Sequence, residues 1–330
     1  MRSLRPTEFL IIAGLFVASL AIAQAPVAAP ARPAVVAAIP AAPATPPSPV
    51  QGIRNKLSAG DLLSAESMLE SHGARVGQDG PYLLGMSWLA RGALLTGDAA
   101  KAHQYAADVL ARCADSLGAG ARLDSSHDVE IALGAAIEVE AQLLEQEKGA
   151  RKAADYVKAA ISRYAGPVPF AARLHKRLNM LSWTGATAPE LVPEDFVGSA
   201  PPALASLKGK PVVIFVWSAT CGDCKAQAAT IARVKAKAGS DVQWIALTRY
   251  YEDDAKDRPA EKAVVDSVWK SVYADAGTVP IVMSTASMVS YGGSSTPTYV
   301  FIDRRGIVRG YTPTRLTAAE FDRQMAAILR

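Results

Sequence analysis

The chain has 330 residues, of which 50% belong to the apolar and aromatic set AVILMFWYC and 20% are charged. The length suffices for two ordinary domains, and the composition excludes a chain that is disordered throughout. The 35 basic and 31 acidic residues leave a net charge of +4, so we expect no nucleic-acid binding, which requires a stronger basic excess. Three cysteines are too few for a disulfide scaffold.

The first 23 residues have the pattern of an export signal. Two arginines precede an apolar run from Phe9 to Ala23 that ends in a small-x-small motif. The run is shorter than the roughly 20 residues that a membrane-spanning helix requires. We therefore interpret residues 1–23 as a signal peptide, with a buried helix or an uncleaved membrane anchor as the alternatives. The signal peptide and the anchor both predict an exported, periplasmic protein.

Residues 24–50 are rich in alanine and proline and carry a single charge. Proline fixes the backbone angle φ and lacks an amide donor, so a regular helix or a sheet interior is excluded here. We expect an extended, semi-rigid linker.

Residues 51–184 are predicted to form an all-α domain. Apolar residues recur at three- and four-residue spacing, and glycines interrupt the pattern at 59–61, 96–98 and 148–149. Such breaks end one helix and begin the next, which predicts three helical hairpins. The arrangement is similar to tetratricopeptide repeats but lacks their regular period of about 34 residues. We expect a tetratricopeptide-like domain that docks a protein partner or a second subunit; a plain helical domain is the alternative.

The other potentially reactive groups of this region indicate no site. Cys113 lies on the apolar side of a predicted helix over 99–117, which is typical of a small buried side chain. All four histidines lie within the first 175 residues, and their spacing shows no metal-ligand pair, so we expect no metal.

Residues 188–330 are predicted to form an α/β sandwich, because strand and helix patterns alternate and a hairpin and a final helix follow. The predicted strands are 211–217, 242–248, 279–283, 297–303 and 307–311, and the predicted helices are 221–237, 260–274 and 317–329. Thr317 and Glu320 have the spacing of a capping box at the start of the final helix.

Cys221 and Cys224 flank Gly222 and Asp223 at the junction of a predicted strand and helix. Their spacing places both sulfurs on one side of a helical turn, within reach of a disulfide. Cys221 at the helix N-terminus is predicted to be the attacking thiolate. Cys224, one turn deeper, is predicted to be the resolving thiol.

Other uses of a cysteine pair fit this sequence poorly. A zinc site requires two more ligands, and the region after His175 has no histidine and no third cysteine. Covalent haem attachment requires histidine directly after the second cysteine, where this chain has Lys225. We therefore predict a redox-active disulfide that needs no bound cofactor or metal.

The C-terminal region resembles the extracytoplasmic TlpA and ResA thiol–disulfide oxidoreductases, which are thioredoxin-like. The resemblance rests on 188–191 (Ala-Pro-Glu-Leu), 207–211 (Leu-Lys-Gly-Lys-Pro), Trp217 before the cysteine pair, and 296–298 (Thr-Pro-Thr) before 301–303 (Phe-Ile-Asp). It implies a thioredoxin fold in which Pro297 is a cis-proline facing the disulfide. It also implies a substrate groove of Trp217, Gly222, Asp223, Thr296 and Pro297, with Thr296 offering backbone groups to an extended substrate.

Four positions depart from the family pattern. Thr220 and Asp223 stand where a tryptophan and a proline are frequent, and Gln227 stands where a carboxylate moves protons. Phe215 occupies the position of the buried aspartate of thioredoxin. Because no proton shuttle for Cys224 is evident, an inactive, partner-binding protein remains an alternative.

The expected function is disulfide exchange with protein thiols and disulfides, supported by an upstream redox partner. A negative charge at Asp223 disfavours the Cys221 thiolate, from which we expect a mildly reducing protein. The hydroxyl of Ser218 three residues before Cys221 also matches a peroxidase site, but Ile214 replaces the proline of that motif. A thiol-dependent peroxidase is therefore the enzymatic alternative.

Overall fold

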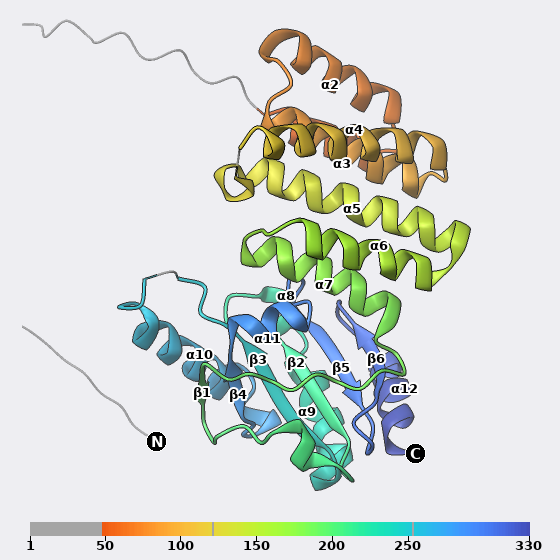
Figure 1. Ribbon diagram of the computed structural model, residues 1–330. Coiled ribbons are helices and arrows are strands. Elements are labelled where there is room, and N and C mark those ends of the chain that lie inside the picture. Colours follow the sequence, from red (N-terminus) through yellow and green to blue (C-terminus); the bar gives the residue numbers. More distant parts are fainter. Residues whose placement is uncertain (1–47, 121, 253) are drawn as a thin grey trace, which may run out of the picture. The chain divides into compact units, whose positions relative to one another are not determined.

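Glycine-punctuated amphipathic segments form three helical hairpins in the N-terminal half of the molecule (Figure 1). The hairpins pair α1 (Val50–Ser58) with α2 (Leu62–Val76), α3 (Gly80–Leu95) with α4 (Ala99–Gly118), and α5 (His127–Lys148) with α6 (Ala150–Arg163). The three predicted breaks are the turns within these hairpins, so that prediction is confirmed. A seventh helix, α7 (Val168–Ser182), follows and leads toward the sheet.

The computed structural model describes residues 48–120, 122–252 and 254–330. The predicted signal peptide and nearly all of the predicted linker lie outside the described residues. Within the described part of the chain, no helix combines the length and apolar character needed to cross a membrane.

The turns within the first two hairpins contain the glycine that ends one helix and the aspartate that caps the next, as the sequence indicated. Asp61 and Asp98 accept hydrogen bonds from backbone amides in the first turns of α2 and α4, each at 3.0 Å. Gly60 and Gly97 before them have positive φ angles of 75° and 83°, which glycine adopts without steric cost. Local sequence therefore determines where these helices end and begin.

The helices enclose a core of small side chains, mostly alanine, leucine and valine from α3, α4 and α5. Cys113 is fully buried in it, and burial raises the pKa of its thiol to about 11. Cys113 is therefore a protonated core side chain at neutral pH, as predicted. Among the described residues, no group of histidine, cysteine and carboxylate side chains could hold a metal ion.

The C-terminal half is a mixed six-stranded sheet in the order β1-β4-β3-β2-β5-β6. The strands are β1 (Asp195–Val197), β2 (Val212–Val216), β3 (Gln243–Thr248), β4 (Ile281–Met283), β5 (Thr298–Ile302) and β6 (Val308–Thr312). The β2–β3 and β3–β4 pairs are parallel and the other pairs are antiparallel. Five of these strands match the sequence prediction, whereas the three-residue β1 was not expected.

Helices cover both faces of this sheet, which is why β2 is buried at every position. On one face, Val213 and Phe215 share a core with α9 (Ala228–Ala238), α10 (Arg258–Val272) and α12 (Ala318–Leu329). On the other face, Ile214 packs with α11 (Thr285–Ser290) and with the segment that follows α7. The predicted α/β sandwich is confirmed, as is the capping box of α12 between Thr317 and Glu320.

One predicted helix is divided in two. The segment predicted as a helix over 221–237 forms α8 (Gly222–Lys225) and α9, separated at Ala226 and Gln227. The Gln227 amide donates to the Cys224 carbonyl, three residues back, which tightens the turn and interrupts the regular ladder. The short α8 is thereby set apart as the element that carries the cysteine pair.

Candidate active site

The cysteine pair lies at the end of the buried strand β2, where the chain turns into α8. Cys221 is the N-cap of α8, and its Sγ accepts the Cys224 amide at 3.1 Å. The two sulfurs lie at disulfide distance, with the Cα atoms 5.2 Å apart. Cys221 is partly exposed, whereas Cys224 is 0% exposed. An incoming molecule can therefore reach the Cys221 sulfur first.

The loop before β5 faces the disulfide. Strand β5 pairs antiparallel with β2, with Thr298 opposite Val216, which brings the preceding residues next to Cys221. The Thr296–Pro297 peptide bond is cis, and the Thr296 carbonyl oxygen lies 3.4 Å from Cys221 Sγ. Sheet pairing therefore brings together two segments that are far apart in the sequence.

Gly222 and Asp223 are exposed beside this contact, and the space above Gly222 is open, since a Cβ placed there would meet no atom within 4 Å. Trp217, in contrast, is 0% exposed. Its indole packs edge-on against Trp269 and Tyr273 in the core, with ring centroids 5.4 Å away in both cases. The Trp217 indole is thus part of the core next to the site. It does not line the substrate groove to which the resemblance assigned it.

Asp223 has a partner that the sequence did not indicate. Arg315, in the loop before α12, lies with Nη1 3.5 Å from the Asp223 carboxylate. Both side chains are more than half exposed, so water screens this ion pair and it adds little stability. The pair nevertheless places one negative and one positive charge beside the entrance to the disulfide.

The core behind the disulfide is neutral. Gln227 is buried, and its Oε1 accepts the Leu316 amide at 2.9 Å and the Tyr299 hydroxyl at 3.2 Å. Phe215 stacks on Tyr299 with ring centroids 5.2 Å apart, and burial raises the pKa of Tyr299 far above its ordinary value. Phe215 and Gln227 do not titrate, and Tyr299 keeps its proton at neutral pH, so none of the three is a proton shuttle.

A cavity of about 300 Å³ adjoins the loop that precedes Cys221. It extends from Ser218 and Thr220 to Tyr251 and Val264, whose side chains are 40% and 50% exposed. The Ser218 hydroxyl lies 3.0 Å from the hydroxyl of Thr220, and no hydrogen bond joins it to a described cysteine sulfur.

Comparisons with known proteins agree with this geometry. Residues 184–321 match the model of the Redoxin family. The match and the sheet topology confirm the thioredoxin-like fold that the resemblance implied, which follows the helical region in this chain.

Solved structures with a similar fold include three proteins of low sequence identity. A thiol-disulfide isomerase from Corynebacterium glutamicum is 16% identical, with a TM-score of 0.38, over 44% of this chain and 97% of its own. A thioredoxin-family thiol:disulfide interchange protein from Chlorobium tepidum is 23% identical, with a TM-score of 0.33, over 44% and 97%. A secreted disulfide oxidoreductase of Mycobacterium tuberculosis is 21% identical, with a TM-score of 0.30, over 37% and 85%. Among curated proteins, none matches the chain.

Proposed function

We propose that the protein is an exported thiol–disulfide oxidoreductase that reduces disulfide bonds in other proteins. The observation that carries the proposal is the unequal access of the two sulfurs. Cys221 is partly exposed at a helix start beside the Thr296 carbonyl oxygen, whereas Cys224 is fully buried behind it. This asymmetry suits a pair in which one sulfur meets the substrate and the other releases it.

The reaction begins with the reduced pair. The Cys221 thiolate attacks one sulfur of the substrate disulfide and forms a mixed disulfide, and the other substrate sulfur leaves as a thiolate. The Cys224 thiolate then attacks the Cys221 sulfur, which closes the Cys221–Cys224 disulfide and releases the second substrate sulfur. Two electrons pass to the substrate, whose two thiolates take up protons from solvent.

The position of Cys221 favours its role as nucleophile. As the N-cap of α8, its sulfur accepts the Cys224 amide at 3.1 Å, and such a hydrogen bond stabilises a thiolate. The described side chains in the core behind the disulfide, Phe215, Gln227 and Tyr299, include no carboxylate, so we propose that water or Asp223 removes the proton of the resolving thiol.

The substrate groove in this proposal consists of Gly222, Asp223, Thr296 and Pro297. The open space above Gly222 admits a polypeptide, and the Thr296 backbone offers hydrogen bonds to an extended strand. The exposed apolar rim of the neighbouring cavity, at Tyr251 and Val264, suits an apolar substrate side chain. These features favour a protein substrate over a small thiol.

The compartment, domains and partners that we propose are inferred from the sequence. The pattern of residues 1–23 supports export, and an oxidising compartment is where protein disulfides persist. We further propose a helical domain over 51–184 that docks a protein partner and a redox domain over 188–330. The oxidised pair requires a dithiol donor to return it to the reduced state, so an upstream redox partner belongs to the cycle.

Reduction of insulin disulfides by the wild-type protein, with dithiothreitol as electron donor, tests the proposed activity. Cys221→Ser should lower the rate at least about 100-fold, because the variant lacks the nucleophile. Cys113→Ala is the matched control, since it removes the buried cysteine outside the site and should retain the wild-type rate. Equal rates for wild type and Cys221→Ser would instead support a binding-only protein.

A further inference from the structure

Helix α7 of the helical region lies directly on the loop that joins α11 to β5. The Asn179 amide group, 2% exposed, donates a hydrogen bond to the Ser290 carbonyl at 2.9 Å. Gly292 has a φ of 66°, and a Cβ placed on it would lie 2.6 Å from the Cα of Lys176. The backbones of α7 and the loop are therefore in contact, and only glycine fits between them.

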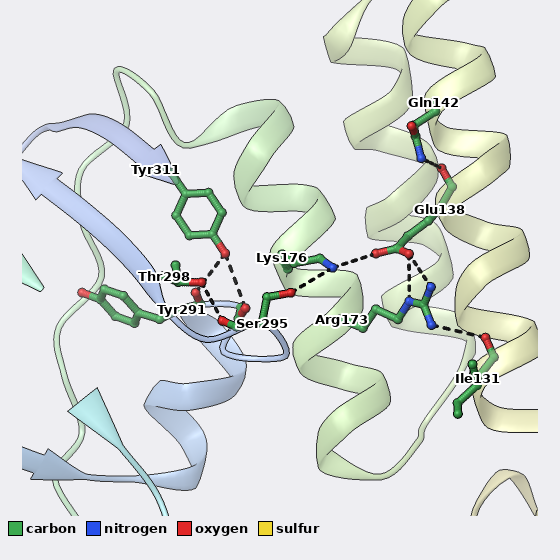
Figure 2. A network of polar contacts seen from close by, with 10 residues as sticks. Ile131, Glu138, Gln142, Arg173, Lys176, Tyr291, Ser295, Thr298 and Tyr311 are labelled. Carbon is green, nitrogen blue, oxygen red and sulfur yellow. Dashed lines mark hydrogen bonds and ion pairs between the residues drawn. The ribbon is translucent and has the colours of Figure 1, made fainter. Parts of the chain in front are cut away.

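The Lys176 side chain extends this contact to Ser295, in the loop before β5 (Figure 2). Its Nζ lies 3.3 Å from a carboxylate oxygen of Glu138 on α5 and 3.5 Å from the hydroxyl of Ser295. The Lys176 and Glu138 side chains are 20% and 15% exposed, so solvent screens their attraction less than on an open surface. The ammonium group thus bridges the helical region and the loop.

Glu138 is a fixed, charged anchor for this ammonium group. The Arg173 Nε donates a hydrogen bond to the other Glu138 oxygen at 2.8 Å. Burial alone would raise the pKa of Glu138, but the positive charges of Arg173 and Lys176 outweigh burial and hold the pKa below its ordinary value. Glu138 is therefore a carboxylate at neutral pH.

Ser295 connects the ammonium group to the active site. It directly precedes Thr296 and Pro297, and the Thr298 hydroxyl donates a hydrogen bond to its carbonyl at 2.7 Å. The Thr296 carbonyl oxygen in turn lies 3.4 Å from Cys221 Sγ. A continuous path of contacts therefore runs from α5 through Lys176 to the backbone that faces the disulfide.

We infer that Lys176 is a positioning residue for the redox site. Held by Glu138, it holds Ser295 and so sets the Thr296 backbone at the position where an extended protein substrate pairs beside Cys221. The helical region thus contributes to recognition of protein substrates by the redox site. The expected effect of Lys176 on activity rests on the proposed function. The expected effect of Lys176 on the loop before β5 rests on geometry alone.

The test compares Lys176→Met with the matched control Lys101→Met, which breaks a similar ion pair with Glu66 inside the helical region. For Lys176→Met we expect the KM for insulin to rise about fivefold with little change in kcat, because pairing with the Thr296 backbone is weakened. The rate at which dithiothreitol reduces the Cys221–Cys224 disulfide should stay unchanged, since this small dithiol needs no backbone pairing. Lys176→Arg, which keeps the positive charge, should have a KM for insulin close to the wild-type value.

Hydrogen exchange supplies a readout that does not depend on activity. The backbone amides of Ser295, Thr296 and Thr298 should exchange faster in Lys176→Met than in wild type or Lys101→Met. Unchanged amide exchange in Lys176→Met would overturn the inference, whether or not the wild-type protein reduces disulfides. A wild-type protein that reduced no disulfide would contradict only the proposed function. A Lys176→Met variant that lost insulin and dithiothreitol reactivity equally would also overturn it, since that pattern indicates general damage.

Discussion

The charge at Asp223 is the residue-scale feature with the most direct bearing on the chemistry. It stands between the two cysteines, where a carboxylate repels the Cys221 thiolate. The structure adds Arg315 at 3.5 Å, which offsets part of this repulsion. Both groups are largely exposed, so the net effect is small and depends on salt.

Replacing Asp223 by Asn should therefore increase the reactivity of Cys221. We expect iodoacetamide to alkylate the reduced variant about threefold faster than wild type at pH 7, because more of Cys221 is present as thiolate. Arg315→Gln should have the opposite effect, since it leaves the carboxylate without its cation. An Asp223→Asn rate at or below that of wild type would contradict this electrostatic account.

The sequence indicated which residues lie together at the disulfide better than it indicated their surroundings. The cysteine spacing and the resemblance pointed to Cys221, Cys224, Thr296 and Pro297, which the sheet brings together. Arg315 could not be predicted, because its contact with Asp223 depends on how the loop before α12 folds back. Trp217 was assigned to the groove because it adjoins the site in sequence, but strand β2 places its indole in the core.

At the scale of elements, the break between α8 and α9 determines where the cysteine pair lies. Gln227 occupies this break, and its buried Oε1 accepts hydrogen bonds from the Leu316 amide and the Tyr299 hydroxyl. The residue therefore links the start of α9 to β5 and to the loop before α12. It serves a structural purpose at a position where the resembling family has a proton carrier.

Gln227→Leu should destabilise the protein by about 2 to 4 kcal/mol, because two buried donors lose their acceptor. Denaturant unfolding measures this loss. The control Gln51→Leu removes an exposed amide on α1 and should change the free energy of unfolding by less than about 0.5 kcal/mol. If Gln227→Leu were as stable as that control, the hydrogen bonds of the Gln227 side chain would not contribute to the stability of the protein.

Most long elements were predictable from periodicity, whereas the short elements β1 and α11 were not. The helices of the three hairpins and strands β2, β3 and β5 show clear patterns over several residues. Strand β1 has three residues and α11 has six, too few for either period to emerge. Periodicity does not indicate the division of the helix over 221–237, where the Gln227 backbone amide donates to the Cys224 carbonyl.

At the scale of the whole molecule, the contact between α7 and the loop before β5 joins the helical region to the redox site. Trp183, just after α7, reinforces it by packing edge-on against Tyr291 and Tyr311, with centroids 5.1 and 5.4 Å away. The sequence predicted both regions but not this contact. The segment around Gly292 has the composition of an ordinary turn, and nothing local indicates that a helix backbone lies against it.

Two glycine substitutions test how close this contact is. Gly292→Ala should cost about 3 kcal/mol or more, because left-handed backbone strain adds to overlap with the Lys176 backbone. Gly306→Ala carries the same kind of strain at a φ of 81° but meets no atom within 4 Å, so it should cost only about 1 to 2 kcal/mol. Equal losses in denaturant unfolding would show that α7 does not press on the loop.

The mixed disulfide at Cys221 tests the central claim most directly. In Cys224→Ser, Cys221 can still attack a protein disulfide, but no resolving thiol remains to release the product. Incubation of the reduced variant with insulin, followed by mass spectrometry without reductant, should reveal a covalent adduct on Cys221 that dithiothreitol removes. The double variant Cys221→Ser/Cys224→Ser should form none. Absence of the adduct from Cys224→Ser, or its equal formation by the double variant, would contradict disulfide exchange at Cys221.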